Sequence, residues 1–240
     1  MINLQNQVAL VTGASRGIGR HISTALASCG ARLILSGRNA EKLGEVKKEI
    51  EAKNGEAIFI PADLAQEAEI IALFRQVRET FGRLDIVINN AGIGYFEDLV
   101  DFPMEKFDQI FRVNMRGTFL CCQEAMKIMI PARSGTIINI SSIQGIKGYP
   151  KQSAYAASKH GIIGMTKSLA AEAQKHNIRV SVILPGAVDT ELIGEARPEL
   201  DRSLMIHPDD IAKTVIFLMS LSERAMIDMI AIRRSTASPF

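Results

Sequence analysis

A tyrosine and a lysine four residues apart are the side chains of this sequence best suited to acid–base chemistry. Tyr155 and Lys159 lie within Ser-Ala-Tyr-Ala-Ala-Ser-Lys-His, residues 153–160. On a helix, positions i and i+4 share one face, about one turn apart. An ammonium group at that distance favours the phenolate, so it lowers the pKa of a tyrosine, which is about 10 in water. We therefore expect Tyr155 to serve as a general acid or base.

A glycine-rich segment near the start of the chain predicts a phosphate-binding loop. Gly13, Gly17 and Gly19 lie in Thr-Gly-Ala-Ser-Arg-Gly-Ile-Gly, residues 12–19, between an expected strand and an expected helix. Glycines permit a tight turn and close approach of the backbone to a pyrophosphate, and the helix N-terminus supplies amide donors. The glycines alone are a weak signal, but their position after the first strand favours a dinucleotide site.

The end of the second expected strand indicates which dinucleotide binds. An NAD site places an acidic residue there, to accept a hydrogen bond from the ribose 2′-hydroxyl. This chain has Ser-Gly-Arg-Asn at residues 36–39, without a carboxylate. Arg38 and Arg16 could pair with a 2′-phosphate, although each could also be a solvated surface residue. We therefore expect NADP(H) rather than NAD.

The elements that must position these residues alternate between strand and helix. Apolar runs predict strands at 8–12, 32–36, 57–60, 84–89, 136–140, 180–184 and 226–232, and helices are expected at 16–29, 40–52, 66–81, 103–130, 153–176 and 208–220. Nearly all-apolar strands separated by helices indicate a parallel sheet covered on both faces. Residues 187–207 show no clear period and are expected to form a lid. Without a linker or composition shift, residues 1–240 are predicted to form a single doubly wound α/β domain.

The composition excludes several classes of function. The net charge is +2, from 28 basic and 26 acidic residues, which gives no electrostatic footprint for nucleic acid or an anionic membrane. Three cysteines, two of them adjacent, argue against a disulfide framework and for a reducing compartment. The four histidines lack metal-ligand spacing, so no metal site is expected. With no signal peptide or apolar run of about 20 residues, we expect a cytoplasmic protein.

Several motifs in this order and spacing resemble those of the short-chain dehydrogenase/reductase family, over about residues 5–220. The match is carried by residues 12–19, Asp63-Leu64, residues 89–92, Asn114, Ser141-Ser142, residues 155–159 and Pro185-Gly186. The resemblance implies a Rossmann-type domain, with a seven-stranded parallel sheet and helices on both faces. It also implies hydride transfer between a nicotinamide and a ketone or secondary alcohol.

The resemblance assigns catalytic roles to Asn114, Ser142, Tyr155 and Lys159. Ser142 would hydrogen-bond the substrate oxygen, and Tyr155 would give that oxygen a proton during reduction. Lys159 would lower the pKa of Tyr155 and bond the nicotinamide ribose, while Asn114 would hold a water in a proton relay to Lys159. The chemistry agrees with these roles, because hydride addition builds negative charge on the oxygen and two hydroxyl donors stabilise that charge.

The same resemblance, added to the glycine loop and the arginines, gives the expected ligand contacts. Asp63 and Leu64 would meet the adenine, and Pro185, Val188 and Thr190 the nicotinamide end. The full set of expected cofactor contacts is Gly13, Ser15, Arg16, Gly17, Ile18, Gly19, Arg38, Asp63, Leu64, Asn90, Ala91, Gly92, Tyr155, Lys159, Pro185, Gly186, Val188 and Thr190. The expected substrate contacts, in a mostly apolar pocket, are Ser142, Gln144, Tyr149 and Tyr155.

The sequence leaves the substrate and the assembly open. A small or medium ketone and a 3-oxoacyl thioester are both compatible with these residues, and the alternative function is a catalytically idle NADP-binding sensor or scaffold. The chain ends in Arg-Arg-Ser-Thr-Ala-Ser-Pro-Phe after an expected strand through Ile232. That ending resembles NADP-dependent carbonyl and sepiapterin-like reductases and puts the family's usual tetramer in doubt. We expect a homodimer, through the helices at 103–130 and 153–176, or a homotetramer.

Overall fold

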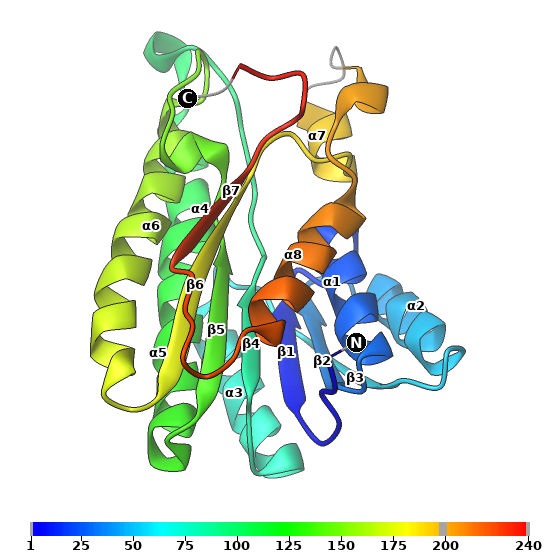
Figure 1. The fold of residues 1–240 in the computed structure, drawn as a ribbon. Helices are drawn as coiled ribbons and strands as arrows, with labels where there is room; N and C mark the ends of the chain where they lie inside the picture. Colours follow the sequence, from blue (N-terminus) through cyan, green and yellow to red (C-terminus); the bar gives the residue numbers. More distant parts are fainter. Residues whose placement is uncertain (1, 197–200, 239–240) are drawn as a thin grey trace.

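A parallel sheet forms the centre of the molecule (Figure 1). The computed structural model describes residues 2–196 and 201–238, and within them the strands form a seven-stranded sheet in the order β3-β2-β1-β4-β5-β6-β7. Every pairing between neighbours is parallel. The strands are β1 (Val8–Thr12), β2 (Arg32–Gly37), β3 (Glu56–Pro61), β4 (Ile86–Asn89), β5 (Gly135–Ile140), β6 (Ile178–Pro185) and β7 (Met229–Ile232).

Helices cover both faces of this sheet, as the apolar strands predicted. One face carries α1 (Gly17–Ser28), α2 (Ala40–Glu51) and α8 (Pro208–Ser220). The other carries α3 (Glu67–Phe81), α5 (Thr118–Ala132) and α6 (Ser153–Gln174) (Figure 1). Alternate residues of β1 serve the two cores, Ala9 and Val11 on the first face and Val8 and Leu10 on the second. The fold is therefore the doubly wound α/β arrangement expected from the sequence.

The helix expected at 103–130 is interrupted. It consists of α4 (Met104–Ile110), a π-helical segment (Phe111–Gly117) and α5. A π-helical turn carries an extra residue and changes which side chains point inward, and such turns are frequent at functional sites. Here it turns Asn114 into the protein, where the side chain is fully buried. The hydrophobic period gave no sign of this interruption, because helix periodicity alone does not reveal a local change in hydrogen-bond register.

The segment after β6 leaves the sheet and returns before α8. It contains α7 (Glu191–Ala196) and a 3-10 turn (Arg202–Leu204), and Val188 and Ile206 form an isolated bridge where it leaves and returns. An ion pair between Arg202 and Asp189 joins its two ends. Part of the lid expected at 187–207, residues 197–200, lies outside the described residues.

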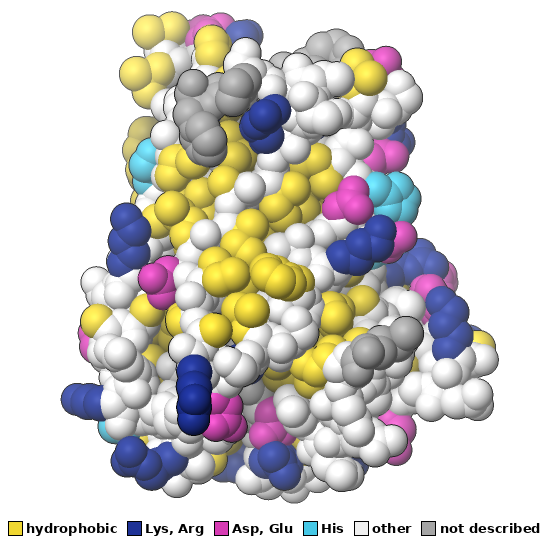
Figure 2. All heavy atoms as spheres, in the orientation of Figure 1, with side chains coloured by type: hydrophobic (Ala, Val, Ile, Leu, Met, Phe, Trp, Pro, Cys, Tyr) yellow, Lys and Arg dark blue, Asp and Glu magenta, His cyan; other side chains and the backbone are white. Residues whose placement is uncertain are grey.

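Two further features concern the surface. The edge strand β7 is shorter than the expected 226–232, and the side chains of Met229, its first residue, and of Met226, which precedes it, are exposed. Figure 2 shows apolar side chains gathered over the middle of the face that carries β7 and α8. Among the residues described, no helix has the length and apolar character needed to cross a membrane.

Candidate active site

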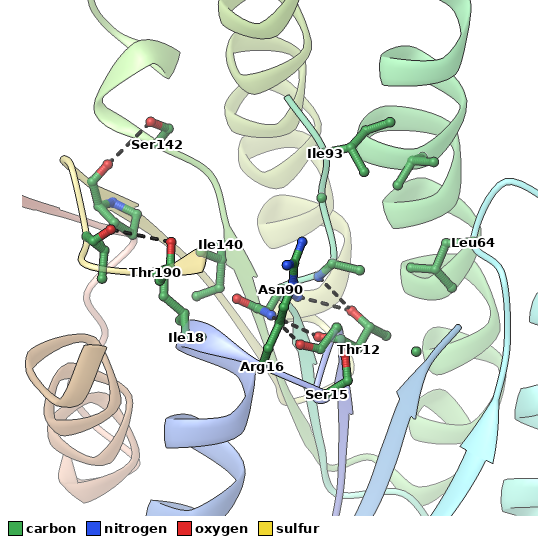
Figure 3. Close-up of a pocket in the computed structure, with 18 of the residues that line it drawn as sticks. Thr12, Ser15, Arg16, Ile18, Leu64, Asn90, Ile93, Ile140, Ser142 and Thr190 are labelled. Carbon is green, nitrogen blue, oxygen red and sulfur yellow. Dashed lines mark hydrogen bonds between the residues drawn. The ribbon is translucent and has the colours of Figure 1, made fainter. Parts of the chain in front are cut away.

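A cavity of about 230 Å³ opens at the carboxyl ends of the strands (Figure 3). In open parallel sheets this edge is where ligands bind, because the strand order reverses there and loops on either side leave a crevice. The expected site residues that line the cavity are Gly13, Ser15, Arg16, Gly17, Ile18, Arg38, Asp63, Leu64, Asn90, Ala91, Gly92, Ser142, Tyr155, Lys159, Pro185, Gly186, Val188 and Thr190. The fold thus brings together residues from widely separated motifs.

Four of the expected residues, Gly19, Asn114, Gln144 and Tyr149, do not line this cavity. Gly19 lies beneath the glycine loop, Asn114 lies behind the cavity wall, and Gln144 contacts Ser142 from the side. Tyr149 is about half exposed on the rim.

Other residues line the cavity that were not among the expected contacts, although Thr12, Ser36, Gly37 and Ser141 lie in the motifs themselves: Thr12, Ser36, Gly37, Ala62, Val113, Ile140, Ser141, Glu191 and Ile193. Thr12, Ser36 and Ile140 are strand residues at the carboxyl edge of the sheet. The available signal for them was their position at a strand end rather than their side-chain chemistry.

The glycine loop lies directly against the loop that follows β4. Gly13 and Gly17 have φ values of +65° and +52°, which side chains rarely adopt. A Cβ atom at Gly13 would lie 2.9 Å from Ala91 Cα, and one at Gly19 would lie 2.2 Å from the Gly13 carbonyl oxygen. Gly13 and Gly19 must be glycine, because backbone atoms occupy the space that a side chain would need.

Thr12 and Asn90 join the two loops (Figure 3). The Asn90 side-chain amide donates to the carbonyl oxygens of Thr12 and Gly13, at 3.1 and 3.2 Å. The Thr12 hydroxyl oxygen in turn accepts from the amides of Asn90 and Ala91, each at 3.1 Å. Asn90 lines the cavity as expected, and its side chain also fixes the shape of the phosphate-binding loop.

The far end of the cavity combines positive charge with an unsatisfied hydroxyl. Arg38 is exposed there, Arg16 is half-buried, and both line the cavity. The Ser36 hydroxyl is buried and has no hydrogen-bond partner among the described residues. A Cβ atom at Gly37 would meet nothing closer than 3.7 Å, so the missing side chain leaves open space beside Ser15. Guanidinium donors, a free hydroxyl and open space suit a phosphorylated ribose.

Asn114 organises the loop after β4 from behind. Its Oδ1 accepts from the Ile93 amide at 2.8 Å, and its Nδ2 donates to the Ile93 carbonyl at 2.9 Å. Nδ2 also lies 3.2 Å from the Ser158 hydroxyl. A Cβ atom at Gly92 would lie 3.3 Å from Asn114 Oδ1 and 3.5 Å from Lys159 Nζ. A side chain at position 92 would therefore contact both the Asn114 amide and the Lys159 ammonium.

Lys159 carries a buried charge. Its side chain is nine-tenths or more buried, and Nζ donates to the Ile140 carbonyl at 3.1 Å. Nζ lies 5.6 Å from the centre of the Tyr155 ring. Loss of hydration disfavours the charged form, so burial lowers the pKa of Lys159 to about 8.

Tyr155 does not show the lowered pKa that the sequence predicted. Burial raises the pKa of Tyr155 to about 12, and the hydrogen bond with Ser142 opposes this only in part. The loss of hydration destabilises the phenolate more than its neighbours stabilise it. The Lys159 ammonium offsets little of this loss, because it is bonded to a carbonyl and burial disfavours its own charge. The protein thus holds Tyr155 firmly in the protonated form.

Ser142 lies beside Tyr155 with its hydroxyl already engaged. Its oxygen accepts from the Gln144 amide at 3.2 Å, and its hydroxyl contacts Gln144 Oε1 and the Pro185 carbonyl, the latter at 3.3 Å. Phe96 packs edge-on against the Tyr155 ring, with centroids 5.7 Å apart. Two hydroxyl groups and an ammonium therefore line one part of the cavity, where they can protonate an oxygen on which negative charge develops.

Known proteins are similar to this chain in sequence. The family model described as short chain dehydrogenase matches residues 7–201. The uncharacterized oxidoreductase YxjF of Bacillus subtilis is 34% identical over 223 residues, which cover 93% of this chain and 87% of that protein. The 3-oxoacyl-[acyl-carrier-protein] reductase FabG of Staphylococcus aureus is 38% identical over 221 residues, covering 88% of this chain and 90% of that protein.

A solved structure agrees over nearly the whole chain. The crystal structure of a metagenomic short-chain oxidoreductase in complex with NADP superposes with a TM-score of 0.87 at 37% identity. The match covers 98% of this chain and 99% of that one.

Proposed function

The chain belongs to the short-chain dehydrogenase family, and we propose that it is an NADP(H)-dependent oxidoreductase that interconverts a ketone and a secondary alcohol. The observation that carries the proposal is the meeting of Ser142, Tyr155 and Lys159 in the same cavity as the glycine loop. A phosphate-binding loop alone would suit many nucleotide ligands. A tyrosine proton donor beside a buried ammonium favours reactions in which a proton is given to, or taken from, an oxygen atom of the substrate.

The residues present fit NADP(H). Gly13, Gly17 and Gly19 allow the tight loop at the N-terminus of α1, where backbone amides can bind a pyrophosphate. Arg38 and Arg16 would pair with the 2′-phosphate, with the unsatisfied Ser36 hydroxyl nearby. The NADP complex of the metagenomic relative supports this choice. When bound, the nicotinamide supplies or accepts the hydride.

The chain's own residues handle the proton and the developing charge. During reduction the Tyr155 hydroxyl gives its proton to the substrate oxygen, while the Ser142 hydroxyl donates a hydrogen bond to the same oxygen. The Lys159 ammonium, 5.6 Å from the ring centre, stabilises the phenolate that Tyr155 becomes. Asn114 holds the loop at residues 91–93 through its two hydrogen bonds to Ile93, which keeps Gly92 next to Lys159.

The substrate is a ketone of small or medium size, or the keto group of a 3-oxoacyl thioester. The S. aureus relative, a 3-oxoacyl-[acyl-carrier-protein] reductase, supports the second possibility. The ring of Phe96 supports an apolar substrate wall. An idle sensor would need the cofactor loop but not the Asn114, Ser142, Tyr155 and Lys159 set, and no observation favours it.

We further propose a cytoplasmic homodimer in which α5 and α6 of the two subunits pack together. Phe119 on α5 is about half exposed, which suits a contact with a partner. On α6 a Cβ atom at Gly164 would meet nothing within 4 Å, so a second helix could approach closely there. The residues 1–240 would act as one domain, with the segment at 187–207 serving as a lid.

A substrate panel tests this proposal. The protein is mixed with NADPH or NADH and, in turn, with simple ketones, diketones and 3-oxoacyl thioesters, and loss of the reduced-nicotinamide absorbance is followed. We expect consumption of NADPH with one of these classes and much slower consumption of NADH. Tight NADPH binding without consumption across the whole panel would instead support the sensor.

A further inference from the structure

Three polar side chains form a hydrogen-bonded series next to the reacting oxygen. The Ser142 hydroxyl contacts Gln144 Oε1, and Gln144 Nε2 donates to Gln152 Oε1 at 2.7 Å. Gln144 belongs to the short 3-10 turn after β5, and Gln152 directly precedes α6, which carries Tyr155. The series therefore links the two elements that hold the proton-donating hydroxyls.

Gln152 is the hydrogen-bond partner of the Gln144 side-chain amide. Gln152 is 3% exposed, and its backbone is held on both sides, because its amide donates to the Tyr149 carbonyl at 3.3 Å and its carbonyl accepts from the Ala156 amide at 2.7 Å. Since Gln144 Nε2 is bonded to Gln152 Oε1, the carbonyl oxygen of Gln144 faces Ser142. Gln144 therefore presents an acceptor, and not a donor, to Ser142.

The single hydroxyl proton of Ser142 cannot serve Gln144 and the substrate at the same time. A serine hydroxyl has one proton to donate. In the structure two acceptors lie within reach of it, Gln144 Oε1 and the Pro185 carbonyl. When Ser142 turns its proton toward a substrate carbonyl, Gln144 Oε1 loses the donor that it has here. An acceptor left without a donor in a partly buried site weakens binding of the transition state.

We propose that the preferred substrates carry a hydroxyl group on the carbon next to the reacting carbonyl, and that Gln144 Oε1 accepts a hydrogen bond from that hydroxyl. This proposal rests on the ketone reductase activity proposed above. Both Gln144 Oε1 and the substrate oxygen would lie within hydrogen-bond distance of Ser142 Oγ, so they are at most about 6 Å apart. A hydroxyl one carbon away from the carbonyl spans that gap.

The second hydroxyl takes no part in the redox step. The ketone becomes a secondary alcohol as its carbon gains a hydride and its oxygen gains the Tyr155 proton, and NADPH becomes NADP⁺. The product is a vicinal diol. Gln144 thus binds the substrate hydroxyl, and Gln152 is a positioning residue that acts through Gln144. A site that bonds a substrate hydroxyl discriminates strongly against substrates that lack one.

Matched ketones test the proposal. Acetoin is compared with its methyl ether, and 2-hydroxycyclohexanone with its methyl ether, because each ether keeps the electron-withdrawing oxygen but has no proton to donate. We expect kcat/KM with NADPH to favour the hydroxyketone by about 10-fold to 100-fold. Gln144→Met removes the acceptor and keeps a side chain of similar length, so it should abolish most of the preference for the hydroxyketone over its methyl ether. Gln144→Glu keeps an acceptor and should keep the preference for the hydroxyketone.

Two further variants distinguish the effect of the Gln144 amide orientation from a general disturbance of the turn after β5. Gln152→Met removes the group that directs the Gln144 amide, so the ratio should fall part of the way. Ile146→Met changes a partly exposed side chain next to the same turn and should leave the ratio at its original value. An unchanged ratio in Gln144→Met, or reduction of other ketones but none of these four, would overturn the inference and leave the reductase intact. Failure to consume NADPH with every ketone would overturn both.

Discussion

The buried ammonium of Lys159 dominates the electrostatics of the site at the scale of single residues. It has a carbonyl as its hydrogen-bond partner and lies close to Tyr155, and both groups resist ionising. A protonated tyrosine suits reduction, because the proton must be present before the substrate oxygen needs it. The Lys159 ammonium is shielded from water, and keeping a charge there lowers the stability of the folded protein.

Replacing that charge should stabilise the protein and abolish its activity. The pKa of Lys159 falls from 10.5 to about 8 on burial, which corresponds to about 3 kcal/mol of unfavourable free energy at neutral pH. We expect Lys159→Met to raise the free energy of unfolding by about 1–3 kcal/mol, since the lost bond to Ile140 offsets part of the gain. Urea unfolding of both proteins measures this, and a destabilised variant would contradict a costly buried charge.

The stability gain should depend on pH with a definite sign. Below about pH 8 the lysine is protonated in both folded and unfolded chains, so the burial cost is fully present. Between about pH 8 and 10.5 the unfolded chain binds a proton that the folded chain does not, so the stability of the unmodified protein rises with pH. The difference between Lys159→Met and the original chain should therefore shrink across this window, and a constant difference would contradict the assignment.

The π-helical segment is the decisive feature at the scale of elements. It turns Asn114 inward, where the side chain pairs with both backbone groups of Ile93. We expect Asn114→Ala to cost about 1–3 kcal/mol of stability, because two backbone groups lose partners. Turnover should fall by at least about 10-fold as the loop at residues 91–94 loosens.

Hydrogen exchange locates this effect. Exchange should accelerate at residues 91–94 in Asn114→Ala, and much less in Ser158→Ala, which removes only the third partner of Asn114. Equal protection of the loop in the original chain and in Asn114→Ala would show that the π-helical segment does not hold it.

The end of β2 should determine which cofactor is used. Gly37 has room for a Cβ atom, and a carboxylate there would repel a 2′-phosphate and accept from a 2′-hydroxyl. We expect Gly37→Asp to lower kcat/KM with NADPH and raise it with NADH, changing their ratio by about 100-fold or more. Gly37→Asn has nearly the same size without the charge and should change the ratio far less. Equal losses with both cofactors would place the 2′-phosphate elsewhere.

At the scale of the whole molecule, most of the architecture follows from hydrophobic pattern. Apolar strands alternating with helices predicted the parallel sheet with two covered faces, and the structure confirms it. The glycine loop, Tyr155 and Lys159 line the same cavity. They lie near one another because the sheet places the carboxyl ends of its strands at one edge.

Other features could not be derived from the sequence. The π-helical segment involves a change in hydrogen-bond register that leaves the apolar period nearly intact. The raised pKa of Tyr155 depends on how deeply the ring and the lysine are buried, which spacing does not report. The engagement of Ser142 by Gln144 depends on the turn after β5 folding back on itself.

The assembly can be tested with two matched substitutions. Phe119 on α5 and Phe217 on α8 are each 51% exposed, but they lie on opposite faces of the sheet. If α5 and α6 form the interface, Phe119→Glu should halve the mass measured by light scattering, because it buries a charge in an apolar contact. Phe217→Glu should leave the mass unchanged. A halved mass in Phe217→Glu, with an unchanged mass in Phe119→Glu, would instead place the interface on the side of β7 and α8.

The most direct test of the central claim is Tyr155→Phe, with NADPH binding and ketone reduction measured on the same preparation. The substitution removes one hydroxyl and keeps the ring against Phe96. We expect reduction to fall by at least about 1,000-fold, because the proton donor is lost, while the dissociation constant for NADPH changes little. Near-normal reduction by the variant would contradict the role of Tyr155 as the proton donor.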